Sequence, residues 1–294
     1  MKRRTFLTSS LLFSAGCSAP ILNSTIGGKS SEARPEKLRL AVTDIKGLEQ
    51  LKADYEPFRQ ELEKTLGLPI HFFPVRDLLA SAPALLSGKV DLVFAGPSEY
   101  LILRARAEAV PIVSVTRPNY YSVVAVEANS TIQSLADLKG KTIAMRTEGS
   151  TASHIGTTKL LLDAGLNAEN FQVEMLEDGG LEALLNGKVD AWADASARYT
   201  RFVEAAAAGN QVRIIARGQA LPNDVFVVRG TLAPEFIQAI QTEMVNAQTK
   251  LLSAMASTPG NRKYQQSNFV LAADMQYDEL RKVYKAVGLE SVIR

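Results

Sequence analysis

The chain has 294 residues, 46% of them hydrophobic and 22% charged, with a formal net charge of +2. These values predict a globular protein of about two domains with a large core, exclude a disordered or fibrous chain, and argue against a nucleic-acid partner. One cysteine and two histidines, His71 and His154, are too few for a disulfide framework or for a thiolate or histidine metal site, so we expect no metal and no cofactor.

Residues 1–16 have the layout of an export signal. Positions 2–4 are basic, residues 6–13 are mostly apolar, and small residues precede Cys17. The segment resembles a bacterial lipoprotein signal, which implies that Cys17 is lipidated and becomes the first mature residue, although Ser14 replaces the leucine usual in that motif. The arginine pair also resembles a twin-arginine signal, and a Sec signal fits as well, so the export route stays open.

The apolar run is too short to span a bilayer, and no later stretch approaches the roughly 20 apolar residues that a membrane helix needs. We therefore expect membrane attachment through lipid only, on the periplasmic, outer face of the cytoplasmic membrane. Residues 17–36, rich in Gly, Ser and Asn, are predicted to be a flexible tether. Loss of residues 1–16 would change the formal charge from +2 to about −1.

From residue 37 the pattern alternates between strands and helices. Strands are predicted at 38–42, 69–75, 90–95 and 110–115, and helices at 48–66, 77–86 and 98–107. Such alternation favours an α/β fold in which a mostly parallel sheet is covered by helices on both faces.

The same alternation of strands and helices is repeated in the second half of the chain. Strands are predicted at 121–126, 141–146, 171–175, 189–192 and 212–216, and helices at 135–140, 151–164 and 195–208, with a further element at 181–185. The sequence Leu-Leu-x-Gly-Lys-Val-Asp occurs at 85–91 and again at 184–190. We infer two lobes built on one plan, with a ligand held between them beyond the carboxyl ends of the strands.

The C-terminal part adds a strand at 224–229, a long helix at 235–255 and a helix at 277–287, which we expect to return to the first lobe. The predicted domains are residues 37–118 plus 230–294 for lobe 1 and 119–229 for lobe 2. Two hinge crossings, near 117–121 and 225–230, would let the lobes open and close around a ligand.

A predicted oxyanion seat lies where the strand at 141–146 ends. Gly149, Ser150 and Thr151 come directly before and within the start of the next helix, whose first N–H groups are unpaired and carry partial positive charge. The two hydroxyls add donors without bulk. The alternative is that Ser150 only caps the helix.

Several motifs resemble the phosphate/phosphite/phosphonate substrate-binding proteins of bacterial ABC importers. They are Gly-Pro-Ser-Glu-Tyr at 96–100, Tyr-Tyr-Ser-Val-Val at 120–124, Leu-Ala-Asp-Leu-Lys-Gly-Lys at 135–141, Gly-Ser-Thr at 149–151 and Asn-Gly-Lys-Val-Asp-Ala at 186–191. The resemblance runs from about residue 37 to the C-terminus. It implies a type II-like, two-lobed periplasmic binding protein that is not an enzyme, is a monomer, and delivers its ligand to ABC permease transmembrane subunits.

The resemblance also implies a ligand site. The family's tyrosine falls on Tyr120, its helix-start hydroxyls fall on Ser150 and Thr151, with Ser153 as a third, and its carboxylate falls on Asp224. A carboxylate accepts from the P–OH of a protonated oxyanion and repels a proton-free anion such as sulfate, so Asp224 is the predicted selectivity residue.

Three departures from the family pattern narrow the range of expected ligands. The loop at 176–180 has no histidine, Ala197 stands where an amine-binding acid is common, and Leu78 replaces a tyrosine. We therefore expect phosphite, phosphate or a simple alkylphosphonate rather than an amine-bearing phosphonate. His154 either fills the vacated role or, as we favour, is a surface or packing residue. Arg146 is either a charge in the site or an ordinary strand-end arginine.

Two other functions remain open. The same scaffold can bind a different small organic anion or a vitamin precursor. A hydrolase that uses Ser150 or Ser153 with His154 and Asp224 is disfavoured, because the chain has no Gly-x-Ser-x-Gly elbow and His154 directly follows Ser153.

Overall fold

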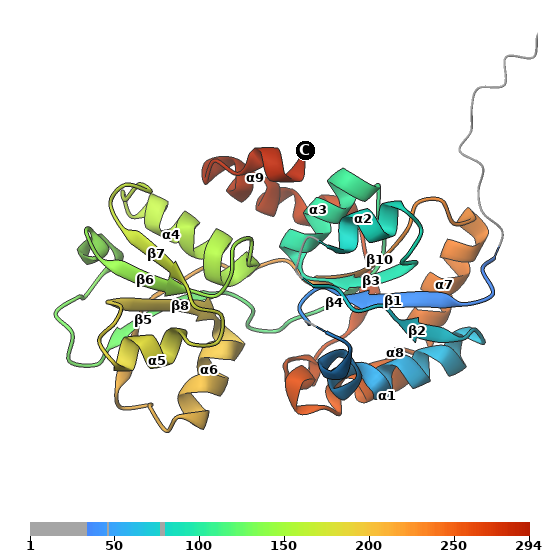
Figure 1. Cartoon of the computed structure of the whole chain (residues 1–294), viewed down its shortest axis with the longest axis horizontal. Helices are drawn as coiled ribbons and strands as arrows, with labels where there is room; N and C mark the ends of the chain where they lie inside the picture. Colours follow the sequence, from blue (N-terminus) through green and yellow to red (C-terminus); the bar gives the residue numbers. More distant parts are fainter. Residues whose placement is uncertain (1–33, 46, 77–79) are drawn as a thin grey trace, which may run out of the picture. The chain divides into compact units, whose positions relative to one another are not determined.

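The computed structural model describes residues 34–45, 47–76 and 80–294. Within them the backbone forms a six-stranded sheet in the order β11-β4-β10-β3-β1-β2 and a five-stranded sheet in the order β7-β6-β8-β5-β9 (Figure 1). The α/β class expected from the pattern is therefore present. In the described part, no helix is both long and apolar enough to cross a membrane.

The first sheet is mixed. Its strands are β1 (Leu38–Val42), β2 (Ile70–Phe72), β3 (Leu92–Ala95), β4 (Val110–Val115), β10 (Asp224–Val228) and β11 (Phe269–Leu271). β1 is parallel to β2 and β3, whereas β10 is antiparallel to β3 and β4, and β11 is antiparallel to β4. The expectation of a mostly parallel sheet thus holds only around β1, because β10 and β11 run the opposite way.

The second sheet has the same mixed character. Its strands are β5 (Ser122–Glu127), β6 (Thr142–Met145), β7 (Gln172–Met175), β8 (Ala191–Ala195) and β9 (Val212–Arg217). β6 is parallel to β7 and β8, and β5 is antiparallel to β8 and β9. In each sheet a parallel trio of strands is extended by antiparallel neighbours.

Strand 224–228 corrects the predicted domain boundary. It was expected to close the second lobe, but β10 inserts between β3 and β4 of the first sheet. A run of apolar residues predicts a strand without specifying its partners, which explains the error. The predicted crossing at 225–230 is therefore wrong in position, and the chain passes back to the first sheet before residue 224.

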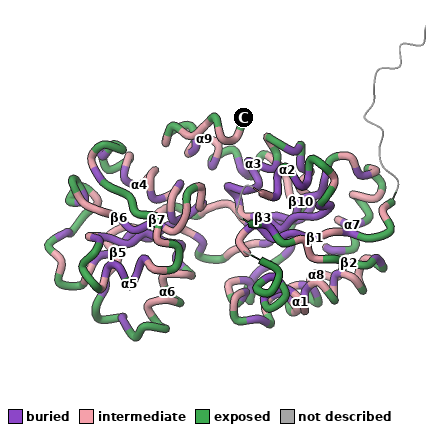
Figure 2. The backbone as a smooth tube through the Cα atoms, viewed as in Figure 1, coloured by how far each residue is buried: buried purple, intermediate pink, exposed green. Residues whose placement is uncertain are grey.

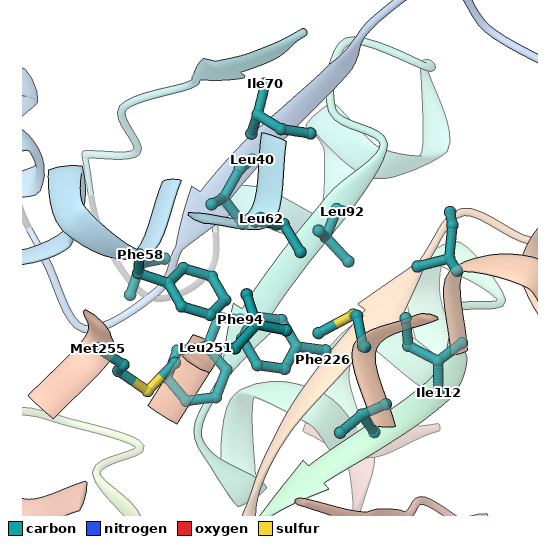
Figure 3. Packing of buried hydrophobic residues seen from close by; sticks show 14 of the residues in the cluster. Leu40, Phe58, Leu62, Ile70, Leu92, Phe94, Ile112, Phe226, Leu251 and Met255 are labelled. Carbon is teal, nitrogen blue, oxygen red and sulfur yellow. The ribbon is translucent and has the colours of Figure 1, made fainter. Parts of the chain in front are cut away.

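Helices cover both faces of the first sheet (Figure 1). One apolar cluster joins the strands to α1 (Leu48–Leu66), α7 (Pro234–Asn246) and α8 (Gln248–Ala256), and the other joins them to α2 (Ser81–Leu86), α3 (Pro97–Ala107) and α9 (Asp278–Ala286). In the first cluster the rings of Phe94 and Phe226 stack at 4.3 Å, and Phe58 stacks on Phe226 at 5.4 Å (Figure 3). Alternate strand residues serve both clusters, so the strands are mostly buried (Figure 2).

Helices also pack on both faces of the second sheet. Apolar residues beside η1 (Leu135–Leu138) and on α4 (Thr157–Asp163) cover one face, and those on α5 (Gly180–Leu185) and α6 (Ser196–Ala205) cover the other. The predicted helix 235–255 is divided at Ala247 into α7 and α8. The predicted C-terminal helix, α9, packs on α3 of the first sheet, as expected, and is flanked by η4 (Asp274–Tyr277) and η5 (Glu290–Ile293).

The two copies of the Gly-Lys-Val-Asp motif adopt the same local structure, one in each sheet. Gly88 and Gly187 both adopt a φ of 66°, a left-handed conformation that glycine tolerates, and each ends a helix just before a strand. Asp91 then accepts from the backbone N–H of Arg39 at 2.9 Å, and Asp190 accepts from that of Thr142 at 2.9 Å. The inference of two lobes on one plan is thus supported at the level of single hydrogen bonds.

Candidate functional site

A cavity of about 1010 Å³ is lined by residues from both sheets. On the first sheet many of these residues follow the ends of β1, β3 and β4 or begin β10, and on the second many follow the ends of β6 and β8 or precede β5. Residues of α1, α3, α6 and η3 complete the wall. Ligands of α/β sheets bind beyond the carboxyl ends of parallel strands, and the cavity has that position on both sheets.

Ser150 and Thr151, the predicted ligand-binding hydroxyls, both line the cavity. They begin η2 (Thr151–Gly156), a wide π-type turn in which the N–H groups of His154 and Ile155 both donate to the Ser150 carbonyl at 3.0 Å. Thr151 is buried, and its Oγ1 accepts from the backbone N–H of Ser98 at 3.1 Å. A hydroxyl that accepts one bond still has its own proton to donate, so Thr151 can offer that proton to a ligand.

Neighbouring hydroxyls stabilise the wide turn. Ser122 Oγ and Thr157 Oγ1 donate to the Ala152 carbonyl at 2.7 and 3.1 Å. Nδ1 of His154 accepts from the N–H of Gly149 at 3.0 Å, and burial lowers the pKa of His154. His154 is absent from the cavity wall and fixes the loop before the turn, which agrees with the packing interpretation.

Ser153, the predicted third hydroxyl, does not reach the cavity. It is fully buried, donates to the Ala193 carbonyl at 2.6 Å and accepts from the N–H of Arg146 at 2.8 Å. The turn directs this side chain toward the sheet, so Ser153 ties the end of β6 to β8. Cys17, the predicted lipidation site, and Leu78 lie outside the described residues.

Tyr120 and Asp224 both lie in the cavity wall, but both carboxylate oxygens of Asp224 already accept hydrogen bonds from other side chains. Arg117 Nη1 donates to Asp224 Oδ1 at 3.2 Å, and the hydroxyl of Tyr264 donates to Oδ2 at 2.5 Å. The guanidinium carbon of Arg117 lies 3.5 Å from the centroid of the Tyr120 ring. Asp224 therefore holds Arg117 against Tyr120, and it is not the free carboxylate that the resemblance implied.

Burial and charge act in opposite directions on this pair. The side chains of Arg117 and Asp224 are only 9% and 5% exposed. Burial alone would lower the pKa of Arg117, but the Asp224 charge and hydrogen bond, together with the Tyr120 and Tyr264 hydroxyls, raise that pKa above its ordinary value. A buried, hydrogen-bonded pair of this kind is rigid, and it gives the crossing segment that carries Arg117 and Tyr120 a fixed position.

Asp44 links cations from the two sheets. It follows β1, and its carboxylate accepts from Arg146 Nη1 at 2.5 Å and from Lys263 Nζ at 3.5 Å. Arg146 follows β6, and Lys263 lies in η3 (Pro259–Tyr264). Burial tends to raise the pKa of Asp44, but the charges of Arg146 and Lys263 hold it well below its ordinary value. The Asp44 charge in turn raises the pKa of Arg146, so Arg146 is a charge in the site rather than a solvated strand end.

A second charged group lies in the cavity wall beyond β8. Arg198 Nε contacts Asp194 at 3.1 Å, and its Nη2 donates to Asp178 at 2.5 Å. No group of three or more metal-ligating side chains occurs in the described part of the chain. The arrangement is therefore one of hydroxyls, backbone N–H groups and paired cations, which are the groups that bind small anions in proteins.

Comparison with known proteins places this geometry in a family. A sequence model described as "ABC transporter, phosphonate, periplasmic substrate-binding protein" matches residues 41–277. The phosphate-import protein PhnD of Mycolicibacterium smegmatis is 24% identical over 285 residues, which cover 89% of this chain and 89% of that protein.

Solved structures share the fold. PhnD1 from Prochlorococcus marinus in complex with methylphosphonate has a TM-score of 0.71 at 17% identity, covering 87% of this chain and 100% of that one. A binding protein component of an ABC phosphonate transporter from Pseudomonas aeruginosa has a TM-score of 0.69 at 17% identity, covering 90% and 95%. These matches confirm the two-lobed periplasmic binding protein fold predicted from the sequence.

Proposed function

Because the chain belongs to the family of phosphonate periplasmic substrate-binding proteins of ABC transporters, we propose that it captures a small phosphorus oxyanion in the cavity between its sheets. Phosphite, phosphate and simple alkylphosphonates are the proposed ligands. Members of this family bind a substrate for a permease and are not enzymes, so the hydrolase alternative falls.

The observation that carries the proposal is the pair of hydroxyls at the start of η2, both in the cavity wall. We propose that Ser150 and Thr151, with the first N–H groups of η2, donate to the oxyanion and that Tyr120 contacts it from the crossing segment. Ser153 and Asp224 then act indirectly, Ser153 by fixing the turn and Asp224 by fixing Arg117 and Tyr264.

Charge in the cavity supports an anionic ligand. Arg146 and Lys263 both donate to the carboxylate of Asp44. This carboxylate is thus an anion held between two cations. An incoming oxyanion would compete with Asp44 for the same donors. We propose that Arg146 and Lys263 provide most of the positive charge that the ligand meets.

The proposal is tested by calorimetric titration of the purified protein with phosphite, phosphate, methylphosphonate and sulfate. We expect at least one phosphorus compound to bind clearly more tightly than sulfate. Sulfate binding as tight as the best phosphorus ligand would contradict the selectivity, and an organic molecule found by native mass spectrometry in protein purified without added ligand would contradict the ligand class.

We further propose that the lobes are residues 37–118 plus 224–294 and 119–223, joined by crossings at 116–121 and 218–223. The crossings are hydrogen-bonded to each other, from the N–H of Arg117 to Asn223 Oδ1 at 3.2 Å and from the N–H of Leu221 to the Tyr120 carbonyl at 2.9 Å. Paired crossings favour a hinge that bends as one unit. Small-angle X-ray scattering checks this, since ligand should reduce the radius of gyration.

For the N-terminal segment we propose that residues 1–16 are removed, that Cys17 is acylated, and that residues 17–36 tether a monomer to the membrane. Detergent partitioning of the full chain should place it in the detergent phase, and Cys17→Ala should move it to the aqueous phase. Equal partitioning of the two forms would contradict the anchor. Analytical ultracentrifugation of residues 34–294 would test the monomer.

A further inference from the structure

Glu99 is a buried carboxyl that the proposed site does not yet use. It lies in the first turn of α3, is 7% exposed, and lines the cavity. Its Oε2 has no hydrogen-bond partner, and the same holds for two other buried atoms of cavity-lining residues, Thr43 Oγ1 and Arg146 Nε. Buried polar atoms without partners are costly in a protein, so groups of this kind in a cavity wall point to a ligand that completes them.

The backbone leaves space for this carboxyl. Gly96 precedes α3 in an extended conformation that any residue can adopt, yet a Cβ at that position would lie 2.6 Å from Glu99 Oε2. A side chain at position 96 would therefore displace the Glu99 carboxyl from its present position, so the glycine leaves room for that carboxyl rather than serving its own backbone angles. Gly96 and Glu99 line the same cavity, so the carboxyl is seated at its wall.

The surroundings shift the titration of Glu99 to near neutral pH. Burial raises the pKa of Glu99 to about 7, and the charges of Asp44 and Asp224 act in the same direction, whereas Arg146 lowers it. The hydroxyls of Tyr120 and Tyr284 also interact electrostatically with this carboxyl. A carboxyl in this condition can donate or accept one proton within the range in which phosphorus oxyanions change their own protonation.

Asp224 cannot take this role without losing its partners, because Arg117 and Tyr264 already donate to its two oxygens. We propose that Glu99, and not Asp224, shares one proton with the bound phosphorus oxyanion. Either the Glu99 O–H donates to an oxygen of HPO₄²⁻, or the Glu99 carboxylate accepts from a P–OH of H₂PO₄⁻. Both forms contain the same protons, one more than the Glu99 carboxylate and HPO₄²⁻ that predominate before binding at pH 8.5. Thr43 Oγ1 and Arg146 Nε donate to neighbouring ligand oxygens. This proposal rests on the proposed function.

The test counts protons. Inorganic phosphate is titrated into the protein at pH 8.5 by calorimetry in two buffers that differ in ionisation enthalpy. We expect the wild-type protein to take up close to one proton for each phosphate bound, and its apparent Kd to rise about tenfold per pH unit above pH 8. In Glu99→Gln the side-chain amide donates without first taking a proton from solution. This variant should therefore bind phosphate without proton uptake, and its Kd should depend little on pH in this range. Asp224→Asn, shown by circular dichroism to be folded, is the comparison variant, and whatever its affinity it should still take up close to one proton for each phosphate that it binds.

Binding by the wild-type protein without proton uptake would overturn the proposal, and this measurement does not depend on any variant folding. Uptake that persists in Glu99→Gln, or that disappears in an Asp224→Asn variant that is folded and still binds phosphate, would also overturn it. If phosphate, phosphite and methylphosphonate all fail to bind the folded wild-type protein at every pH, the proposed function itself fails, and the proton-sharing role fails with it.

Discussion

The backbone N–H of Ser98 donates to the side-chain oxygen of Thr151 at 3.1 Å, which joins the start of α3 to the start of η2. The two helix starts come from different sheets and meet at one cavity. Each start has N–H groups without helical acceptors, so two sources of partial positive charge converge on the same space. The bond also restrains the Thr151 side chain at the cavity wall.

The first prediction concerns the hydroxyls of η2. Thr151→Val keeps the shape of the side chain but removes its donor, and we expect phosphite affinity to fall by about 10–100-fold, the effect of losing a hydrogen bond to a charged group. Ser150→Ala combined with Thr151→Ala should abolish measurable binding. Calorimetry gives the affinities, and circular dichroism melting shows that the double variant is folded.

Ser153→Ala is the matched control for that experiment. This hydroxyl bonds to the Ala193 carbonyl and the Arg146 N–H and faces away from the cavity. We expect the variant to lose about 1–3 kcal/mol of unfolding free energy while its phosphite affinity changes less than that of Thr151→Val. A larger affinity loss in Ser153→Ala would return Ser153 to the ligand site.

The second prediction concerns the buried pair of Arg117 and Asp224. Arg117→Met leaves the Asp224 carboxylate buried without its cation, so we expect a loss of about 3–5 kcal/mol in unfolding free energy by urea titration. Tyr264→Phe removes only the second donor to that carboxylate and should cost about 1–3 kcal/mol. Equal stability of Arg117→Met and wild type would show that the pair contributes nothing.

The third prediction follows from the raised pKa of Glu99. The unfolded chain releases this proton at the ordinary glutamate pKa and the folded chain only near 7, so the wild type loses stability as pH rises between those values. Glu99→Gln has no such loss. We expect it to gain on the order of 1–3 kcal/mol over the wild type at pH 8 and little at pH 4.5, as measured by urea unfolding at both pH values. A gain that is the same at both would contradict the titration.

The fourth prediction concerns competition by Asp44. Asp44→Asn removes the negative charge that Arg146 and Lys263 now meet, and we expect phosphate affinity to increase several-fold. Calorimetry at two salt concentrations checks the electrostatic origin, since the gain should shrink at high ionic strength. Weaker binding by Asp44→Asn would mean that this carboxylate contacts the ligand instead of competing with it.

Local signals in the sequence were sufficient for part of the site. Ser150 and Thr151 follow a glycine at the end of a strand, and Tyr120 precedes the next predicted strand, so their positions depend only on their neighbours in the chain. The two repeats of Leu-Leu-x-Gly-Lys-Val-Asp likewise predicted two lobes, because each forms a helix end and a strand start within seven residues.

The remaining features depend on partners that are distant in the chain. Arg117 is 107 residues from Asp224, and Arg146 is 102 residues from Asp44, so no spacing rule connects them. The same limit explains β10, whose apolar run predicts a strand but not the sheet that receives it, and β11, which has only three residues. Glu99 was visible within the Gly-Pro-Ser-Glu-Tyr motif, but its orphaned oxygen was not.

Ile155 gives the contact between the lobes a contribution that does not depend on charge. This residue belongs to η2 on the second sheet, yet it is fully buried in the apolar cluster that contains Tyr100 and Tyr284 of the first. Separating the lobes would wet its side chain at a cost of roughly 2 kcal/mol. Added salt therefore weakens the capture of an anion but leaves this apolar contact intact, so ionic strength would change the occupancy of the protein more than the contact between its lobes.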